Sequence, residues 1–302
     1  MHSRDRVTAP ARIVAATDFS PDAGYAVSRA AILASQHRAS LELLHVASRS
    51  SLDALREWVR TPADFAERMV EDVRRLLEEG AADIARSTGI AATARVEIGD
   101  VTDVVRSHCD HADLLAVGAH GLNPLRDAIL GTTVERLVGR CRRPILVVRR
   151  PPAVYRNVLV PVDLLAGSHN GLATAARIAP EARITVIHAY DVPFEGALVR
   201  AGVSAAEIDA HRAQAFQKAL DAIGKLSESV GGGPGRFLPM VERGDAARLV
   251  IERERSLGAD LIVIEKRARS SVEALLLGSV TRHILADAGC DVLVLPCPSN
   301  SL

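Results

Sequence analysis

The sequence predicts tandem α/β domains, each built on a doubly wound parallel sheet. Three observations favour this fold class: short continuous apolar runs, helix-start signals between them, and a repeat of the whole pattern along the 302 residues. Continuous apolar runs are typical of strands that helices cover on both faces. Strands that alternate with helices favour right-handed crossovers and therefore a parallel sheet.

The composition agrees with a sheet of this kind and argues against a nucleic-acid partner. Apolar residues make up 48% of the chain but aromatic residues only 3%, so the core must be built from Ala, Val, Leu and Ile. Basic and acidic residues balance at 37 each, whereas a nucleic-acid-binding domain usually carries a basic excess. The short basic run from Arg140 to Arg150 is interpreted as a helix end or a linker.

The first half of the chain recurs in the second half, and five segments match in the same order. Internal repeats of this kind define the domain organisation before any other signal. The matched positions lie 143 to 147 residues apart, and they pair Asp18 with Asp163, His45 with His188, Gly99 with Gly244, Asp113 with Asp260, and Pro144–Val148 with Asp291–Leu295. The stiff polar segment Arg149–Pro152 follows the fifth matched strand of the first half. The sequence therefore predicts one domain over residues 1–150 and a second over 151–302.

Start signals for helices stand between the apolar runs. Ser20 precedes Pro21 and Asp22, which predicts an N-cap followed by proline at the first helical position. Asp100 is a second candidate N-cap, placed directly after Gly99. Longer helices are expected at residues 63–87 and 204–229.

Three glycines after the fourth strand carry the most specific chemical signal. Gly118 and Gly121 follow a predicted strand, at the edge where ligands bind in open α/β sheets. Glycine lets a backbone approach a phosphate closely. Gly131, followed by Thr132 and Thr133, then opens a helix whose first N–H groups and dipole favour an anion. Turn formation alone is the alternative, but three glycines at this spacing favour a phosphate site.

The spacing Gly-x2-Gly-x9-Gly-Thr resembles the ATP-binding signature of the universal stress protein family. The opening strand and loop Ile13–Ser20, the segment Leu44–Val46 and the pair Gly99–Asp100 are also similar to that family. The resemblance covers essentially the whole chain as two copies, and it is more specific in the first half.

The resemblance implies a five-stranded parallel sheet of the adenine nucleotide α-hydrolase-like type in each domain. It implies ATP as the ligand, with Mg²⁺, across the ends of strands one and four. Carried over by position, the residues around the adenine and ribose would be Ala16, Thr17, Asp18 and Val46. Those along the ribose and the α- and β-phosphates would be Val117, Gly118, His120 and Gly121. Those at the outer phosphates would be Gly131, Thr132, Thr133 and Val134.

Asp18 also has a simpler interpretation, as a cap for the nearby helix, but its repetition as Asp163 favours ligand contact. In the family, domains pair through their fifth strands. The two halves could pair in this way within one chain as a pseudo-dimer, or the chain could form a homo-oligomer.

The second half departs from the signature. Aligned on Gly278 and Ser279, the two upstream glycines become Glu265 and Ala268. A carboxylate repels phosphates, and Cβ atoms crowd the backbone, so weak or no ATP binding is expected there. The neighbouring cations could hold another anion, although exposed charges without a partner are the favoured interpretation; these cations are Lys266, Arg267 and Arg269.

Other signals are weaker. The cysteines Cys109, Cys141, Cys290 and Cys297 form no CxxC pair, and no signal sequence or bilayer-length apolar stretch is evident, which indicates a cytoplasmic protein. His108 and His111 lie one helical turn apart, but a helix C-terminus attracts histidine without any metal. His45 and His188 are interpreted as packing against neighbouring loops.

The favoured function is therefore a cytoplasmic, ATP-binding stress-response or regulatory protein that holds nucleotide in its first domain. One alternative is an enzyme that hydrolyses ATP or adenylates a substrate. We recognise no general base for water attack, so slow hydrolysis or self-phosphorylation on Thr132 or Thr133 is the most that the sequence allows. The other alternative is a module that binds a lipid or a protein instead of nucleotide.

Overall fold

The computed structural model describes residues 9–58, 65–121, 130–164, 168–191, 195–231, 235–266 and 278–296. By their internal contacts these residues form two compact units. Of the described residues, the N-terminal unit comprises those up to Val154 together with Lys266, Gly278 and residues 291–296, and the C-terminal unit comprises those within Tyr155–Glu265 and Ser279–Cys290. The last segment of the second repeat thus packs with the first repeat.

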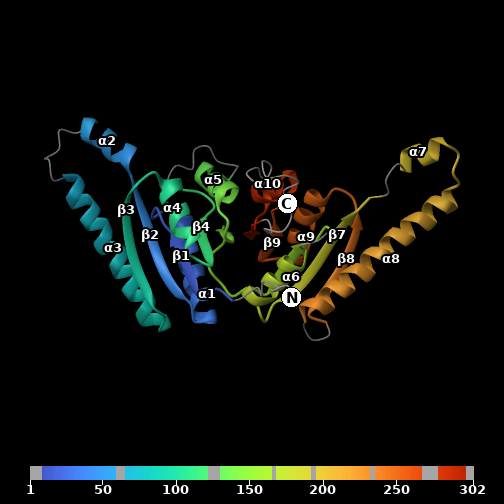
Figure 1. The fold of residues 1–302 in the computed structure, drawn as a ribbon, viewed down its shortest axis with the longest axis horizontal. Coiled ribbons are helices and arrows are strands. Elements are labelled where there is room, and N and C mark those ends of the chain that lie inside the picture. The colour runs from blue at the N-terminus through green and yellow to red at the C-terminus, as the bar shows by residue number, and fades with distance from the viewer. Residues whose placement is uncertain are drawn as a thin grey trace, which may run out of the picture. The chain divides into compact units, whose positions relative to one another are not determined.

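The N-terminal unit alternates strands and helices (Figure 1). Its elements are β1 (Arg12–Ala16), α1 (Pro21–His37), β2 (Ser40–Ser48), α2 (Arg49–Trp58), α3 (Phe65–Thr88), β3 (Ala92–Gly99), α4 (Val101–Asp110), β4 (Leu114–Gly118), α5 (Thr132–Arg140), β5 (Ile145–Val148) and β10 (Asp291–Leu295). The strand order is β3-β2-β1-β4-β5-β10. The first five strands are parallel, as the sequence predicts, and β10 runs antiparallel to β5.

The C-terminal unit repeats this plan. Its elements are β6 (Asn157–Pro161), α6 (Ser168–Ile178), β7 (Arg183–Tyr190), α7 (Glu195–Arg200), α8 (Ala205–Val230), β8 (Phe237–Arg243), α9 (Ala246–Leu257), β9 (Leu261–Glu265) and α10 (Ser279–Asp287). Its strands are parallel in the order β9-β6-β7-β8. The predicted long helices are observed as α3 and α8, whereas α2 was not predicted.

The predicted helix caps are present. Ser20 Oγ accepts a hydrogen bond from the backbone N–H of Ala23 at 3.3 Å, and Pro21 follows it at the first helical position. Asp100 accepts from the N–H of Asp103 at 3.0 Å and caps α4. These caps satisfy N–H groups that have no partner inside the helix, and they fix where each helix begins beside the sheet.

A buried ion pair attaches the last strand of the second repeat to the N-terminal unit. Arg29 Nε lies 3.0 Å from Asp291 Oδ2, and both side chains are almost fully buried. Asp291 Oδ1 also accepts the backbone N–H groups of Arg149 and Arg150, at 2.9 and 3.2 Å. The register places Val292 opposite Val147, so the two fifth strands pair within one chain, as the resemblance implies.

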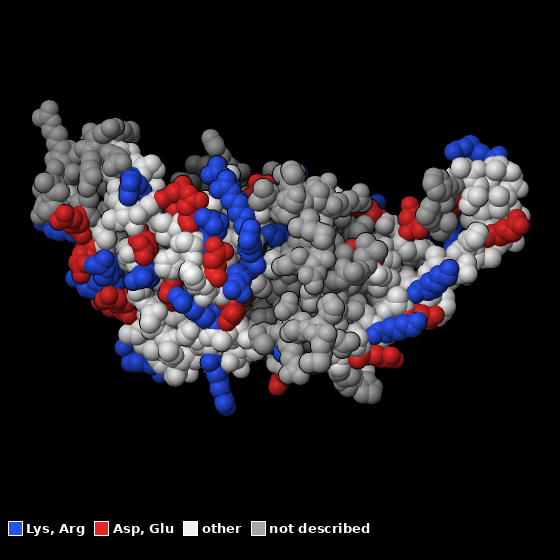
Figure 2. Space-filling view, viewed as in Figure 1, with Lys and Arg blue, Asp and Glu red and all other residues white. Residues whose placement is uncertain are grey.

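Charge is mixed on the visible surface of the chain. In Figure 2, Lys and Arg are interspersed with Asp and Glu on the face shown. None of the described helices is both long and apolar enough to cross a membrane.

Candidate functional site

The strand order creates a switch point between β1 and β4 in the N-terminal unit. The chain leaves β1 toward β2 on one side, and β4 pairs with β1 on the other side. The helices that follow these two strands diverge, and they leave a crevice at the carboxyl edge of the sheet. A cavity of about 940 Å³ lies at this edge, which is within the size range of small-molecule sites.

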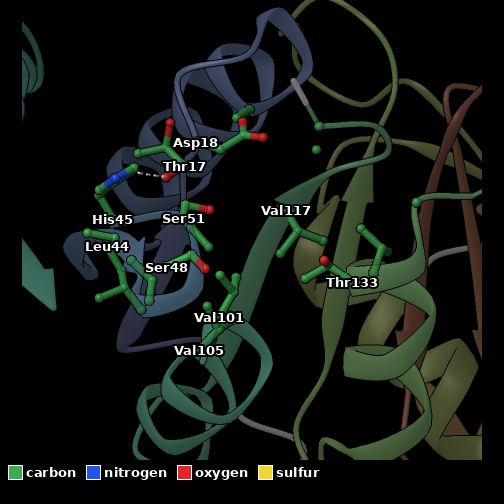
Figure 3. Close-up of a pocket in the computed structure, with 18 of the residues that line it drawn as sticks. Thr17, Asp18, Leu44, His45, Ser48, Ser51, Val101, Val105, Val117 and Thr133 are labelled. Atoms are coloured by element: carbon green, nitrogen blue, oxygen red, sulfur yellow. Dashed lines mark hydrogen bonds between the residues drawn. The ribbon is translucent and has the colours of Figure 1, made fainter. Parts of the chain in front are cut away.

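All twelve residues that the resemblance assigns to a ligand line this one cavity. They come from the ends of β1, β2 and β4 and from the start of α5, and they are Ala16, Thr17, Asp18, Val46, Val117, Gly118, His120, Gly121, Gly131, Thr132, Thr133 and Val134. Figure 3 shows Thr17 and Asp18 on one side of the cavity and Val117 and Thr133 on the other. Residues up to 118 positions apart in the sequence thus line the same cavity.

Close packing, not an unusual backbone angle, requires glycine at position 118 and leaves little room for a side chain at position 121. A Cβ on Gly118 would lie 2.6 Å from the carbonyl carbon of Asp22, and one on Gly121 would lie 2.8 Å from Asp18 Oδ2. Neither glycine has a positive φ, so a turn alone does not demand it. The first turn of α1 therefore lies directly on the backbone at the end of β4.

A hydrogen-bonded pair joins the loop after β4 to the start of α1. Asp22 Oδ2 lies 2.8 Å from His120 Nδ1 and accepts the backbone N–H of His120 at 3.2 Å. Ser20 Oγ lies 3.4 Å from the carbonyl oxygen of His120. These contacts fix the segment from His120 to Gly121 at the edge of the cavity.

Asp18 lines the cavity and also shapes its own loop. Its Oδ1 accepts the backbone N–H of Ser20 at 3.0 Å, while Ser20 itself is the N-cap of α1. Ser20, and not Asp18, is therefore the residue that caps α1. The next residue, Phe19, has a φ of 64°, and its half-exposed ring lies 5.0 Å from the ring of His45.

The strand-two histidine packs against this loop, as predicted. His45 Nδ1 lies 2.8 Å from the carbonyl oxygen of Thr17, the contact drawn as a dashed line in Figure 3. His188 makes the matching contact in the C-terminal unit, at 2.8 Å from the carbonyl oxygen of Val162. His45 also lines the cavity, a role that the sequence did not suggest.

The start of α5 faces the cavity without a side-chain cap, because its N-cap residue is Gly131. Thr132 and Thr133 are exposed, and both line the cavity. The first N–H groups of a helix and its dipole attract an anion, and hydroxyls add further donors. This end of the cavity can therefore hold a phosphate or a carboxylate.

An apolar wall, whose residues the sequence analysis did not assign to the site, closes the other side of the cavity. It comes from α2, α3, β3 and α4, and its members are Leu52, Met69, Val70, Val73, Val96, Val101 and Val105, with Ser48 and Ser51 beside them. The spacing of Val101 and Val105 marks one helix face, but the same spacing is typical of any helix face packed on a core. A flat apolar ring would find its partners along this wall.

The equivalent strand end in the C-terminal unit is filled by the protein itself. Glu265 stands at the end of β9, where Gly118 stands at the end of β4, and its Oε1 accepts a short hydrogen bond from the N–H of Gly171 in α6. Asp163 Oδ1 accepts from Ser168 Oγ at 3.1 Å. The position of Ala268 lies outside the described residues.

One sequence interpretation was wrong at this place. Lys266 was expected to be an exposed cation without a partner, but only 8% of it is exposed. Its Nζ donates to the carbonyl oxygens of Val138 and Cys141, at 2.7 and 3.0 Å, because a buried ammonium needs acceptors. Arg267 and Arg269 lie outside the described residues.

Cys109, Cys141 and His108 have structural partners, and Cys297 lies outside the described residues. Cys109 and Cys141 are buried side by side, and the hydrogen bond that the Cys109 thiol donates to Cys141, followed by burial, raises the pKa of the Cys109 thiol. His108 Nδ1 lies 2.6 Å from Glu42 Oε1. Among the described residues, no group of three or more His, Cys, Asp or Glu could hold a metal ion.

The fold and the cavity define a doubly wound α/β protein with a cavity at its strand switch point. The family model of the universal stress proteins matches residues 11–149 and 154–296, and the chain therefore belongs to this family, with two tandem domains.

Similar proteins agree with this assignment. The chain is 30% identical over 157 residues to a universal stress protein of Methanocaldococcus jannaschii, covering 51% of this chain and 89% of that protein. It is 22% identical over 298 residues to one of Mycolicibacterium smegmatis, covering 93% and 96% of the two chains. The structure of a universal stress protein from Archaeoglobus fulgidus has the same fold, with a TM-score of 0.69 at 16% identity, covering 96% and 97%.

Proposed function

We propose that this chain is a regulatory protein that binds Mg-ATP in the cavity of its N-terminal unit. The observation that carries the proposal is the convergence of all twelve signature positions on one cavity. An apolar wall for the base stands on one side, and an uncapped helix start for the phosphates stands on the other. Nucleotide occupancy would bias the contacts that the protein makes with partners in a stress response.

The chemistry of the lining fits each part of the ligand. Val101 and Val105 offer an apolar surface for adenine, and the Asp18 carboxylate can accept a ribose hydroxyl. The hydroxyls of Thr132 and Thr133 and the first N–H groups of α5 can donate to the outer phosphates. Mg²⁺ prefers hard oxygen ligands, and Asp18 together with the phosphates would supply them.

The C-terminal unit would not bind nucleotide in the same way. The Glu265 carboxylate already accepts an N–H group of α6, and its negative charge would repel a phosphate. We therefore propose one nucleotide for each chain. The division into domains at residue 150 follows the sequence repeat, although β10 packs with the N-terminal unit.

Calorimetric titration with Mg-ATP tests this proposal, after a check that no nucleotide co-purifies. One site per chain is expected, and a hundredfold excess of ligand over its dissociation constant should stabilise the folded state by about 2.7 kcal/mol. Gly131→Glu should abolish binding by placing a carboxylate at the start of α5.

The matched control is Gly278→Glu, at the position that aligns with Gly131 in the second repeat. Within the described parts of the chain nothing lies within 4 Å of a Cβ on Gly278, so this variant should fold and bind like wild type. Two sites per chain would contradict the role given to Glu265. No binding and no thermal shift would overturn the ATP proposal and favour an apolar or protein ligand for the cavity.

The same samples test the two finer parts of the proposal. Release of inorganic phosphate measures whether bound ATP turns over, and slow or no turnover is expected because no general base is recognisable. Size-exclusion chromatography with light scattering measures whether two chains associate, with and without Mg-ATP. Fractionation of cells that express the protein tests the cytoplasmic location.

A further inference from the structure

Lys266 belongs to the second repeat, yet its ammonium group lies at the C-terminal end of α5 in the N-terminal unit. Its Nζ donates to the carbonyl oxygen of Val138 at 2.7 Å and to that of Cys141 at 3.0 Å. Cys141 is the C-cap residue of α5. Because Lys266 is nearly fully buried, water screens this charge much less than it would at the surface.

The last carbonyl groups of a helix have no partner inside the helix, and they form the negative end of its dipole. A lysine there satisfies the carbonyls and complements the dipole. The same cation is one cause of a lowered pKa at the Cys141 thiol, after the larger contribution of the hydrogen bond with Cys109. The charge of Lys266 therefore acts on the carbonyl groups of Val138 and Cys141 and on the Cys141 thiol.

The opposite end of α5 is the proposed phosphate site. The helix runs from Thr132 to Arg140, nine residues, which corresponds to a length of roughly 13 Å. Its first residues line the cavity, and Gly131 supplies no side-chain cap. A short helix thus has a buried cation at its negative end and an open, ligand-facing positive end.

The sequence repeat shows that this cation is specific to the second copy. Lys266 follows β9 as Ala119 follows β4, and both residues donate their backbone N–H to the fifth strand, Ala119 to Val148 and Lys266 to Leu295, each at 2.9 Å. The backbone is thus equivalent, but an alanine side chain cannot reach a helix end. Only the second repeat supplies a charge from this position.

We infer that Lys266 is a positioning residue for the anionic part of the ligand, an inference that rests on the proposed function. By holding and polarising the C-terminal end of α5, it keeps the N-terminal end fixed and favourable for phosphate. The departure of the second repeat from the signature thus has two consequences. Glu265 occupies the strand end of the C-terminal unit that is equivalent to Gly118. Lys266 supports the proposed phosphate site at the start of α5 in the N-terminal unit.

The test compares a charged ligand with a neutral one that shares the same base and ribose. Lys266→Met removes the charge and the hydrogen bonds, and Lys266→Gln removes the charge but keeps a donor. Both variants should bind Mg-ATP about two- to fivefold more weakly, as expected for the Coulomb attraction between a buried unit charge and a phosphate roughly one α5 length away. Their affinity for adenosine should equal that of the wild-type protein, because adenosine carries no phosphate.

If Lys266 acted only in folding, its variants would lose affinity for Mg-ATP and adenosine together, or would keep both affinities unchanged. Either result would overturn the inference. Lys218→Gln, an exposed lysine on α8, is the control for net charge and should change neither affinity. If Lys266→Met does not fold, Lys266→Gln still decides the outcome through the ratio of the two affinities. If wild-type protein binds neither ligand, the proposed function fails first, and that result is distinguishable from the others.

Discussion

The two units differ most sharply at one equivalent strand end, Gly118 in the N-terminal unit and Glu265 in the C-terminal unit. Gly118 lies against the backbone of α1 with no room for a side chain. Glu265 has its carboxylate folded onto an N–H group of α6. In the N-terminal unit the start of α1 borders a cavity. In the C-terminal unit the carboxylate of Glu265 lies at the start of α6 and complements the positive end of that helix.

The frame around that difference is the same in both units. A histidine of the second strand contacts the loop carbonyl after the first strand in each case, at 2.8 Å. The residue after the loop aspartate has a positive φ in both, 64° at Phe19 and 60° at Leu164. The repeat therefore preserves the backbone of the strand end, while the residues that face a ligand change.

The largest expected effect concerns the strand that the second repeat contributes to the N-terminal unit. Asp291→Ala leaves Arg29 buried without its carboxylate, and loss of one partner of a buried pair costs about 3–5 kcal/mol. Denaturant unfolding, monitored separately for each unit by hydrogen exchange, should show this loss in the N-terminal unit. A loss confined to the C-terminal unit would contradict the division of the chain described above.

Making the first unit resemble the second should remove its ligand site. Gly118→Glu forces a side chain into the 2.6 Å gap to Asp22 and adds a negative charge. Affinity for Mg-ATP should fall by more than about 100-fold, since both the backbone approach and the sign of the charge are lost. Calorimetry measures the change, and circular dichroism shows whether the variant is folded.

The reciprocal variant separates loss of a site from gain of one. Glu265→Gly removes the carboxylate from the start of α6. However, Ser279 and Val280 stand where the first repeat has Thr132 and Thr133, so one of the two hydroxyl groups is missing. We expect no second Mg-ATP site in this variant. Appearance of one would mean that Glu265 alone closes the C-terminal unit.

Sequence reasoning predicted those features that depend on neighbouring residues or on strand ends. The caps at Ser20 and Asp100 and the helices α3 and α8 follow from local patterns. The signature positions meet because carboxyl ends of parallel strands share one edge of the sheet. These are consequences of chain geometry that a pattern can express.

Features that depend on distant partners were missed. The burial of Lys266 depends on carbonyl groups 125 and 128 residues earlier in the chain, which no local pattern reports. The apolar wall of Met69, Val70 and Val73 looked like an ordinary core face, because its spacing is the same whether a core or a cavity faces it. The packing of β10 with the N-terminal unit likewise depends on partners far apart in the sequence, such as Arg29 and Asp291.

A smaller effect should follow when the charge of Glu265 is removed but its shape is kept. Glu265→Gln still offers an oxygen to the N–H of Gly171, but it no longer complements the positive end of α6. The C-terminal unit should lose about 1 kcal/mol of unfolding free energy, since charged acceptors at helix starts contribute about that much. Hydrogen exchange of α6 measures this, and unchanged exchange would show that the charge of Glu265 is not what stabilises the closed site.

The smallest expected effect compares the two left-handed loop residues directly. Leu164→Gly relieves a positive φ and should stabilise the C-terminal unit by a few tenths of a kcal/mol, because relief of about 1 kcal/mol is partly offset by the greater chain entropy of glycine. Phe19→Gly relieves the same strain but loses the ring contact with His45, so its net effect should be near zero or destabilising. Thermal unfolding of both variants measures the difference. If Phe19→Gly were the more stabilising of the two, the ring contact beside the cavity would contribute nothing, and the aromatic residue would be retained there for contact with a ligand instead of for the stability of the loop.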